Sequence, residues 1–145
     1  MAKQVLDIAA MEEDFFSDKS FIGISCALPG YRFCWLLNQY FNISFVREPN
    51  YDIRIQSKQG DDLYFPIYNY IQPLSTTEHH IYTLKNGNEH LLPEAKQLDY
   101  IWMIQSPTVE PDTENINKQL RQIAEIQLSQ VLVAEKFKSI SSLLL

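Results

Sequence analysis

Glycine, cysteine and basic residues are scarce in this sequence of 145 residues. It has four glycines, and none belongs to the glycine-rich pattern that cradles a phosphate, so a P-loop or dinucleotide site is not expected. Its two cysteines, Cys26 and Cys34, match no metal or redox spacing, and we expect both to be small buried side chains. Acidic residues outnumber basic ones by 18 to 12, and the resulting net charge of −6 disfavours binding to nucleic acid.

Long apolar segments are also missing from the chain. No run of about 18 apolar residues is present, so no transmembrane helix is expected. The first residues, MAKQVLDIAAMEEDFF, turn acidic early and lack the apolar core of a secretory signal peptide. These absences predict a cytoplasmic protein that is not attached to a membrane, and no motif for a cofactor is present.

The sequence does have the composition of a globular domain. Hydrophobic residues make up 46% and charged residues 21%, and the length suits one domain over residues 1–145. Within it we expect residues 1–19 to be a loosely ordered start and residues 139–145 to be a tail. All eight tyrosines lie between Tyr31 and Tyr100, so the aromatic residues concentrate in the middle of the chain.

The first part of the chain predicts two strands, a helix and a third strand. Residues 3–9 and 21–28 are short apolar runs typical of strands. Within residues 29–42 apolar side chains recur every three or four residues, which predicts a helix with Pro29 at its entrance. Apolar and polar residues then alternate over residues 51–56, as in a strand with one buried face.

The middle of the chain predicts a strand that contains a proline, followed by a hairpin. Residues 63–71 read as a strand, but Pro66 cannot donate a ladder hydrogen bond, so we expect a sheet edge or a bulge there. The pair Asn86-Gly87 predicts a two-residue type I′ turn in which Lys85 faces Asn88. The same register places Thr83 opposite His90, Ile81 opposite Leu92 and His79 opposite Glu94.

The last part predicts a central strand and a long helix. Residues 98–105, LDYIWMIQ, are apolar enough for a well-buried strand. Residues 114–138 predict a helix, and beyond Leu128 its apolar side chains lie on all sides, which indicates burial on more than one side. We therefore expect a homodimer through this helix, with Val133 and Phe137 at the contact. The whole order is β-β-α-β-β-β-β-α, an α+β fold with an antiparallel sheet of five to six strands and two helices.

The segment LPEAKQLDY, residues 92–100, resembles the signature of the IPExxxVDY family of small bacterial proteins. Leucines replace the isoleucine and valine of the signature, and four residues match as they stand: Pro93, Glu94, Asp99 and Tyr100. The runs FIGISCAL and YRFCWLLN also resemble the N-terminal half of that family, with matches at Tyr31, Arg32 and Asn38. The resemblance implies a small cytoplasmic bacterial protein of unknown function, and it transfers no catalytic residue or cofactor.

The two carboxylates of this segment favour an architectural role over catalysis. In an extended chain Glu94 and Asp99 would lie about 17 Å apart, and in a helix they would lie on different faces. A pair of carboxylates for acid–base work needs a separation of roughly 5 to 10 Å. Because Asp99 borders a buried strand and needs a partner, we predict that Arg32 bridges the helix to Glu94 or Asp99.

Histidines and tyrosines are the remaining candidates. His79 and His80 would point to opposite faces of a strand, so we expect these and His90 to be exposed hairpin residues rather than metal ligands. Three tyrosines alternate onto one face of their strand, which predicts core packing or a protein contact: Tyr64, Tyr68 and Tyr70. The neighbouring Asp61 and Asp62 disfavour the stacking of nucleic-acid bases on that face.

The sequence as a whole favours a binding protein over an enzyme. We expect a non-enzymatic protein-interaction module that acts as a homodimer, with an unknown protein partner and without a metal or a cofactor. The alternative is a small ligand-binding protein or an enzyme with a pocket around Glu94, Asp99 and His79.

Overall fold

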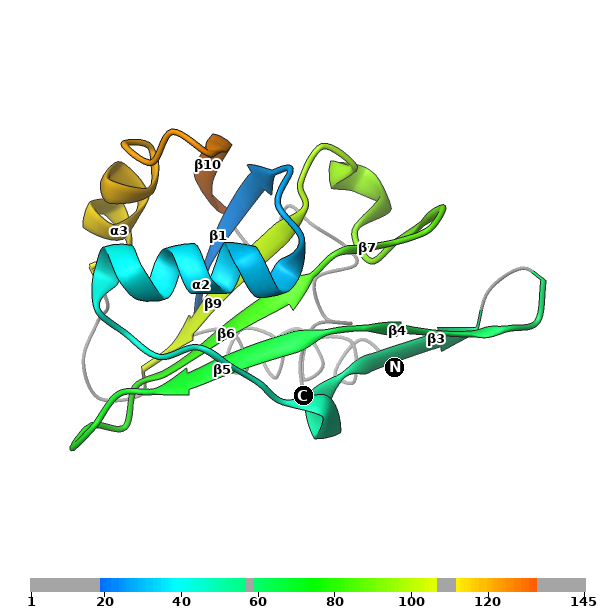
Figure 1. The fold of residues 1–145 in the computed structure, drawn as a ribbon, viewed down its shortest axis with the longest axis horizontal. Coiled ribbons are helices and arrows are strands. Elements are labelled where there is room, and N and C mark those ends of the chain that lie inside the picture. Colours follow the sequence, from blue (N-terminus) through cyan, green and yellow to red (C-terminus); the bar gives the residue numbers. More distant parts are fainter. Residues whose placement is uncertain (1–18, 57–58, 107–111, 133–145) are drawn as a thin grey trace, which may run out of the picture.

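The protein is built around one antiparallel sheet with apolar clusters on both faces. The computed structural model describes residues 19–56, 59–106 and 112–132 (Figure 1). In these residues the sheet has the spatial order β10-β1-β9-β6-β5-β2, and neighbouring strands are antiparallel. Its strands are β1 Lys19–Cys26, β2 Val46–Arg47, β5 Ile67–Ile71, β6 Glu78–Thr83, β9 Tyr100–Gln105 and β10 Ile126–Leu132. The predicted α+β fold is confirmed, and β9 lies inside the sheet as predicted.

Helix α2, Gly30–Phe41, lies across one face of the sheet (Figure 1). It forms because its apolar stripe can be buried against the strands, and Phe33, Cys34 and Leu37 are its buried residues. The helix ends at Asn42, whose φ of 55° is in the left-handed region that stops a helix. The sequence prediction of a helix here is confirmed.

Helix α3, Thr113–Leu120, packs beside β10 and β1 on the same face of the sheet. Its first turn is capped by Asp112, whose carboxylate accepts a hydrogen bond from the backbone N–H of Asn115 at 3.2 Å. Neither α2 nor α3 has the length and hydrophobicity that a membrane crossing requires.

Two small hairpins accompany the sheet. Strands β3, Ile53–Gln56, and β4, Asp62–Phe65, form one of them, and β7, Lys85–Asn86, and β8, Glu89–His90, form the other. Pro66 lies between β4 and β5, where the chain leaves the first hairpin and enters the main sheet. The single strand predicted over residues 63–71 is therefore two strands in two sheets, because proline cannot continue a ladder.

The core has two parts, one on each face of the sheet. The helix-side core contains Ile22, Ile24, Phe33, Leu37, Trp102 and Leu120, among others. The opposite core contains Phe21, Phe65, Tyr82, Leu98, Ile101 and Met103, among others, and the β3–β4 hairpin packs against it. Both cysteines are buried, as the sequence predicts. Strand β9 contributes to both cores, which explains why LDYIWMIQ is apolar at nearly every position.

The prediction of one long C-terminal helix over residues 114–138 is wrong. Helix α3 ends at Leu120, and the chain returns as β10, which pairs with β1. In β10 the apolar side chains take different surroundings: Ile126 lies in the helix-side core, Leu132 lies in the opposite core, and Leu128 and Val131 are partly exposed. The expected contact residues Val133 and Phe137, and the strand expected at 3–9, lie outside the described residues.

The predicted register of the hairpin is also wrong. Lys85 pairs with His90 and Asn86 with Glu89, so the loop consists of Gly87 and Asn88. Gly87 has a φ of 59°, and it stands at the first central position, where a type II′ turn places glycine. Strand β6 pairs with β9 and β5 rather than with residues 90–94, and its pairs on β9 are His79 with Ile104, Ile81 with Trp102 and Thr83 with Tyr100.

Candidate functional site

The signature segment turns sharply before it enters β9. Pro93 opens the 3-10 turn Pro93–Ala95, and the backbone N–H of Ala95 donates to the carbonyl of Leu92 at 2.9 Å. Both leucines that stand for the signature's isoleucine and valine, Leu92 and Leu98, are fully buried in the opposite core. The apolar positions of the segment are thus packing residues, and Glu94 lies on the exposed side of the turn.

Asp99, directly before β9, contacts the end of β1 and the start of β7. Its carboxylate accepts the backbone N–H of Cys26 at 2.9 Å and forms an ion pair with Lys85 at 2.8 Å. Cys26 ends β1 and Lys85 begins β7, so Asp99 holds both beside β9. The predicted bridge from Arg32 to Glu94 or Asp99 is not formed in the described residues: Lys85 pairs with Asp99, and Arg32 is exposed on α2.

Tyr100 fixes the connection between β1 and α2. Its ring stacks on Phe33 with 4.2 Å between ring centroids, and its hydroxyl donates to the carbonyl of Leu28 at 2.5 Å. Burial raises the pKa of the Tyr100 hydroxyl, so this group stays a hydrogen-bond donor at neutral pH. Asp99 and Tyr100 therefore hold the two ends of the short connection from Cys26 to Leu28, and they set where α2 begins.

The prediction that the histidines are exposed is wrong for His79 and His80, which are buried on opposite faces of β6. His79 Nδ1 accepts a hydrogen bond from the indole N–H of Trp102 at 3.0 Å, and burial lowers the pKa of His79 to about 4. His80 is 4% exposed, and burial lowers its pKa as well. Both rings are parts of the core.

His90 is half-buried, and both of its ring nitrogens are engaged. Nδ1 accepts the backbone N–H of Leu92 at 2.8 Å, which leaves Nε2–H to donate to the carbonyl of Leu98 at 2.7 Å. The ring therefore braces the signature segment and is not free to act as a general base. In residues 19–56, 59–106 and 112–132, no group of three histidine, cysteine or acidic side chains is arranged to hold a metal ion.

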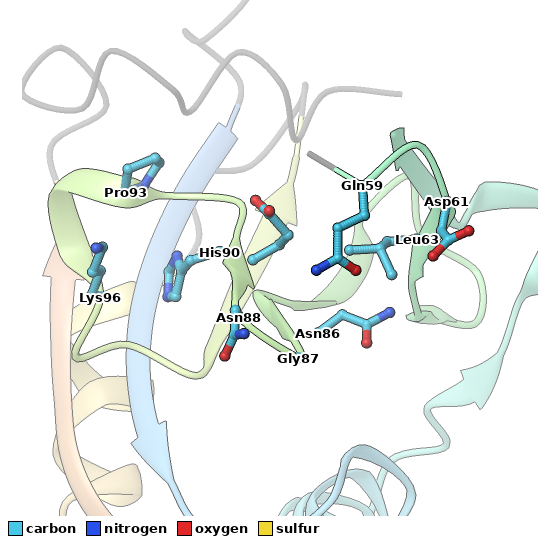
Figure 2. Close-up of a pocket in the computed structure, with 10 residues that line it drawn as sticks. Gln59, Asp61, Leu63, Asn86, Gly87, Asn88, His90, Pro93 and Lys96 are labelled. Carbon is cyan, nitrogen blue, oxygen red and sulfur yellow. The ribbon is translucent and has the colours of Figure 1, made fainter. Parts of the chain in front are cut away.

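A cavity of about 620 Å³ lies between the β3–β4 and β7–β8 hairpins (Figure 2). The first hairpin contributes Asp61 and Leu63 to its lining, and the second contributes residues Asn86–His90. Lys96, from the signature segment, adds a positive charge. The predicted pocket residues Glu94, Asp99 and His79 do not line it. The described residues that line the cavity include no serine, threonine or cysteine, and His90 is bound to backbone groups.

The tyrosine face predicted from the sequence is interrupted at Pro66. Tyr64, on β4, is 52% exposed, whereas Tyr68 and Tyr70, on β5, are half-buried against the helix-side core. A Cβ at Gly30 would lie 3.0 Å from the Tyr68 hydroxyl, so the start of α2 rests directly on this tyrosine. The three rings therefore do not form one contact surface.

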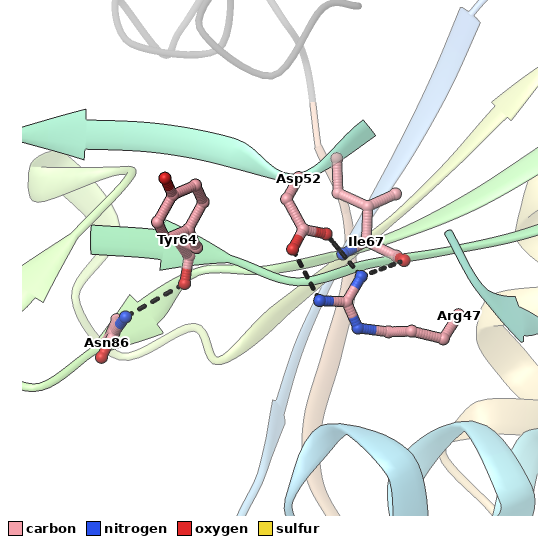
Figure 3. A network of polar contacts seen from close by, with 5 residues as sticks. All are labelled: Arg47, Asp52, Tyr64, Ile67 and Asn86. Atoms are coloured by element: carbon pink, nitrogen blue, oxygen red, sulfur yellow. Dashed lines mark hydrogen bonds and ion pairs between the residues drawn. The ribbon is translucent and has the colours of Figure 1, made fainter. Parts of the chain in front are cut away.

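Arg47 is the cation at the edge of the sheet next to these tyrosines, and it is neutralised (Figure 3). Its guanidinium binds Asp52 through two nitrogens, at 2.5 and 2.6 Å, and the hydrogen bond to Asp52 raises the pKa of Arg47. Asp52 also accepts the backbone N–H of Ile67 at 3.2 Å, so the pair fastens β2 and the η1 turn, Pro49–Tyr51, to β5. In the same view Asn86 donates to the carbonyl of Tyr64 at 3.0 Å.

The outer side of α2 carries the largest exposed aromatic side chains of the described residues. Tyr31 is 68% exposed and Trp35 is 62% exposed, and they lie one turn apart on the same side of the helix. Arg32 and Gln39 are exposed beside them. We name Tyr31, Arg32 and Trp35 the aromatic face of α2.

Sequence reasoning did not identify this face. It treated Tyr31 and Arg32 as structural residues of the segments that resemble the IPExxxVDY family, but the structure places both on the surface. The signal was available, because a helical projection puts Tyr31 and Trp35 opposite the buried stripe of Phe33 and Leu37.

No family model matches this chain, and no curated protein has a similar sequence. The resemblance of residues 92–100 to the IPExxxVDY signature therefore stays a prediction.

Proposed function

We propose that this protein is a non-enzymatic protein-interaction module that binds its partner through the aromatic face of α2. The observation that carries the proposal is the exposure of Tyr31 and Trp35, at 68% and 62%. Tryptophan, tyrosine and arginine are the residue types that contribute most to protein–protein affinity, and all three adjoin here. Two large rings exposed on one turn leave apolar area that a partner could cover.

The rigidity of α2 supports this role. The inner side of the helix is fixed by the stack of Phe33 on Tyr100 and by the burial of Leu37. Its start is held by the hydrogen bond from Tyr100 to Leu28, and its end by Asn38, which bonds to both backbone groups of Phe45. A preformed surface loses little conformational entropy when a partner binds.

The enzyme alternative has less support. Two of the side chains expected to line its pocket already have partners within the fold. Asp99 is bound to Lys85 and to the backbone of Cys26, and His79 is bound to Trp102. The cavity between the hairpins is lined by both polar and apolar groups, and its histidine, His90, is bound to backbone groups through both ring nitrogens.

We also propose self-association through the C-terminal part of the chain, in the cytoplasm of a bacterial cell. The support is that Leu128 and Val131, on the edge strand β10, are 39% and 36% exposed. Light scattering coupled to gel filtration tests it: a dimer that dissociates in Leu128→Asp is expected, and a monomeric wild type would refute it.

The interaction module is tested by purification of the tagged protein from its own cells, followed by mass spectrometry. A partner should be retained by the wild type and lost from Trp35→Ala. Leu74→Ala is the matched control, because Leu74 is a fully exposed apolar residue far from α2 in the sequence. If every protein retained by the wild type is also retained by Trp35→Ala, the aromatic face is not the binding site.

A further inference from the structure

The aromatic face lies in a segment of unusual charge. Between Lys19 and Arg47 the sequence contains one charged residue, Arg32, although the chain as a whole carries a net charge of −6. No acidic residue lies on α2 or on the connections at its two ends. The helix that presents Tyr31 and Trp35 therefore carries a net charge of one positive unit on an acidic protein.

The charge of Arg32 is not neutralised by an ion pair within the described structure. Arg47, a cation at the edge of the sheet, is neutralised by Asp52, whereas Arg32 forms no ion pair in the part of the chain that the structure describes. It also sits in the first turn of α2, which contains no acidic residue and has no side-chain cap. The helix dipole places partial positive charge at this end, so it adds to the charge of Arg32 instead of offsetting it.

We propose that the aromatic face of α2 takes an acidic segment of another protein, with apolar side chains on Tyr31 and Trp35 and a carboxylate on Arg32. The proposal rests on the function proposed above and names the chemistry of the partner. Arginine and a carboxylate can form two parallel charge-assisted hydrogen bonds, which would fix the position of the segment along the helix.

The charge of Arg32 argues against a two-fold contact between the α2 helices of two copies. A two-fold contact between two α2 helices would bring Arg32 close to the Arg32 of the other copy, and α2 has no acidic residue to compensate. Like charges at an interface weaken binding. A symmetric contact between two α2 helices is therefore disfavoured, and self-association at β10 would leave this face available for a different protein.

The spacing of the rings sets the spacing of the apolar side chains in the partner. Tyr31 and Trp35 are four residues apart on a helix, which is about 6 Å along its axis. An extended segment repeats its side chains on one face every two residues, or about 6.7 Å. Apolar residues two positions apart in an extended segment, with an aspartate or glutamate next to them, match the face.

The test is selection of peptides from a displayed library of random linear sequences against the purified full chain. Selected peptides should be enriched in aspartate or glutamate near paired apolar residues. Their affinity should fall about tenfold or more in Trp35→Ala, a typical loss at a central tryptophan. It should also fall in Arg32→Glu and weaken as salt is added. Leu74→Ala, at a fully exposed apolar residue outside α2, is the control and should bind as the wild type does.

Charge reversal separates the two proposals. Selection against Arg32→Glu should enrich basic peptides in place of acidic ones. If peptides or the cellular partner lose binding in Trp35→Ala but show no preference for acidic residues and no response to Arg32→Glu, the interaction module stands and the acidic partner is refuted. Binding that is unchanged in Trp35→Ala refutes both. Thermal unfolding of each variant confirms that these exposed substitutions leave the fold intact.

Discussion

His79 should make the fold sensitive to acid, and His79→Gln should remove that sensitivity. The imidazole is buried in the helix-side region and accepts the indole N–H of Trp102, so it is neutral in the folded state. Glutamine keeps an acceptor for the indole but cannot take up a proton. The comparison of the two proteins therefore isolates the titration of one side chain.

The magnitude follows from the pKa of His79, which burial lowers to about 4 from the ordinary value of about 6.5. Between these values the unfolded chain binds a proton at His79 and the folded chain does not, so the free energy of unfolding falls as the pH falls. At about 1.36 kcal/mol per pH unit, lowering the pH from about 6.5 to about 5 costs about 2 kcal/mol. The contribution is fully present above about pH 6.5.

Urea unfolding followed by tryptophan fluorescence measures the effect at about pH 7 and about pH 5. The stability lost between these pH values should be about 2 kcal/mol smaller in His79→Gln than in the wild type, whatever the stability of the variant at neutral pH. His80 and His90 also have lowered pKa values, so a smaller pH dependence should remain in the variant. Equal losses in both proteins would refute a buried neutral His79. Gln39→Ala, on the exposed side of α2, should keep the full wild-type dependence.

Substitutions at three positions test the architecture of the signature segment by chemical denaturation. Asp99→Ala should destabilise the fold by about 1–3 kcal/mol because it leaves the backbone N–H at the end of β1 without its acceptor, whereas Asp99→Asn should cost less. Tyr100→Phe should cost about 1 kcal/mol, since the ring stack stays and one hydrogen bond is lost. Gly23→Ala should cost about 1–3 kcal/mol, because a Cβ there would lie 2.6 Å from Leu98 Cδ1. Wild-type stability in Asp99→Ala or Gly23→Ala would contradict these contacts.

The sequence predicted helices and strands correctly where the apolar residues repeat with a single period. Residues 30–41 have one apolar stripe and form α2, and the alternation in residues 53–56 forms β3. The break at Pro66 could be located from the chemistry of proline, but the change of sheet at that point depends on which strands lie nearby. Residues 126–132 were assigned to a helix because their apolar residues do not alternate with polar ones, and the buried positions of β10, Ile126, Ser129 and Leu132, are three residues apart.

Partners of side chains were harder to predict than elements. Asp99 needed a cation, and the sequence offered Arg32, but Lys85 on the neighbouring hairpin is closer in the folded chain. The adjacent pair His79 and His80 looked polar enough for the surface, yet β6 lies between β5 and β9, and both faces of that strand are covered. Such pairings are set by strand order, which no local pattern encodes.

The residues that resemble the family signature divide into two groups with connected roles. Asp99 and Tyr100 are bound to backbone at the two ends of the connection between β1 and α2. Tyr31 and Arg32, directly beyond that connection, make no such contact and face outward. Asp99 and Tyr100 fix where α2 starts, and Tyr31 and Arg32 are the side chains that α2 exposes. An architectural role for the signature and a binding role for the protein are therefore compatible, because the buried contacts hold the aromatic face in place.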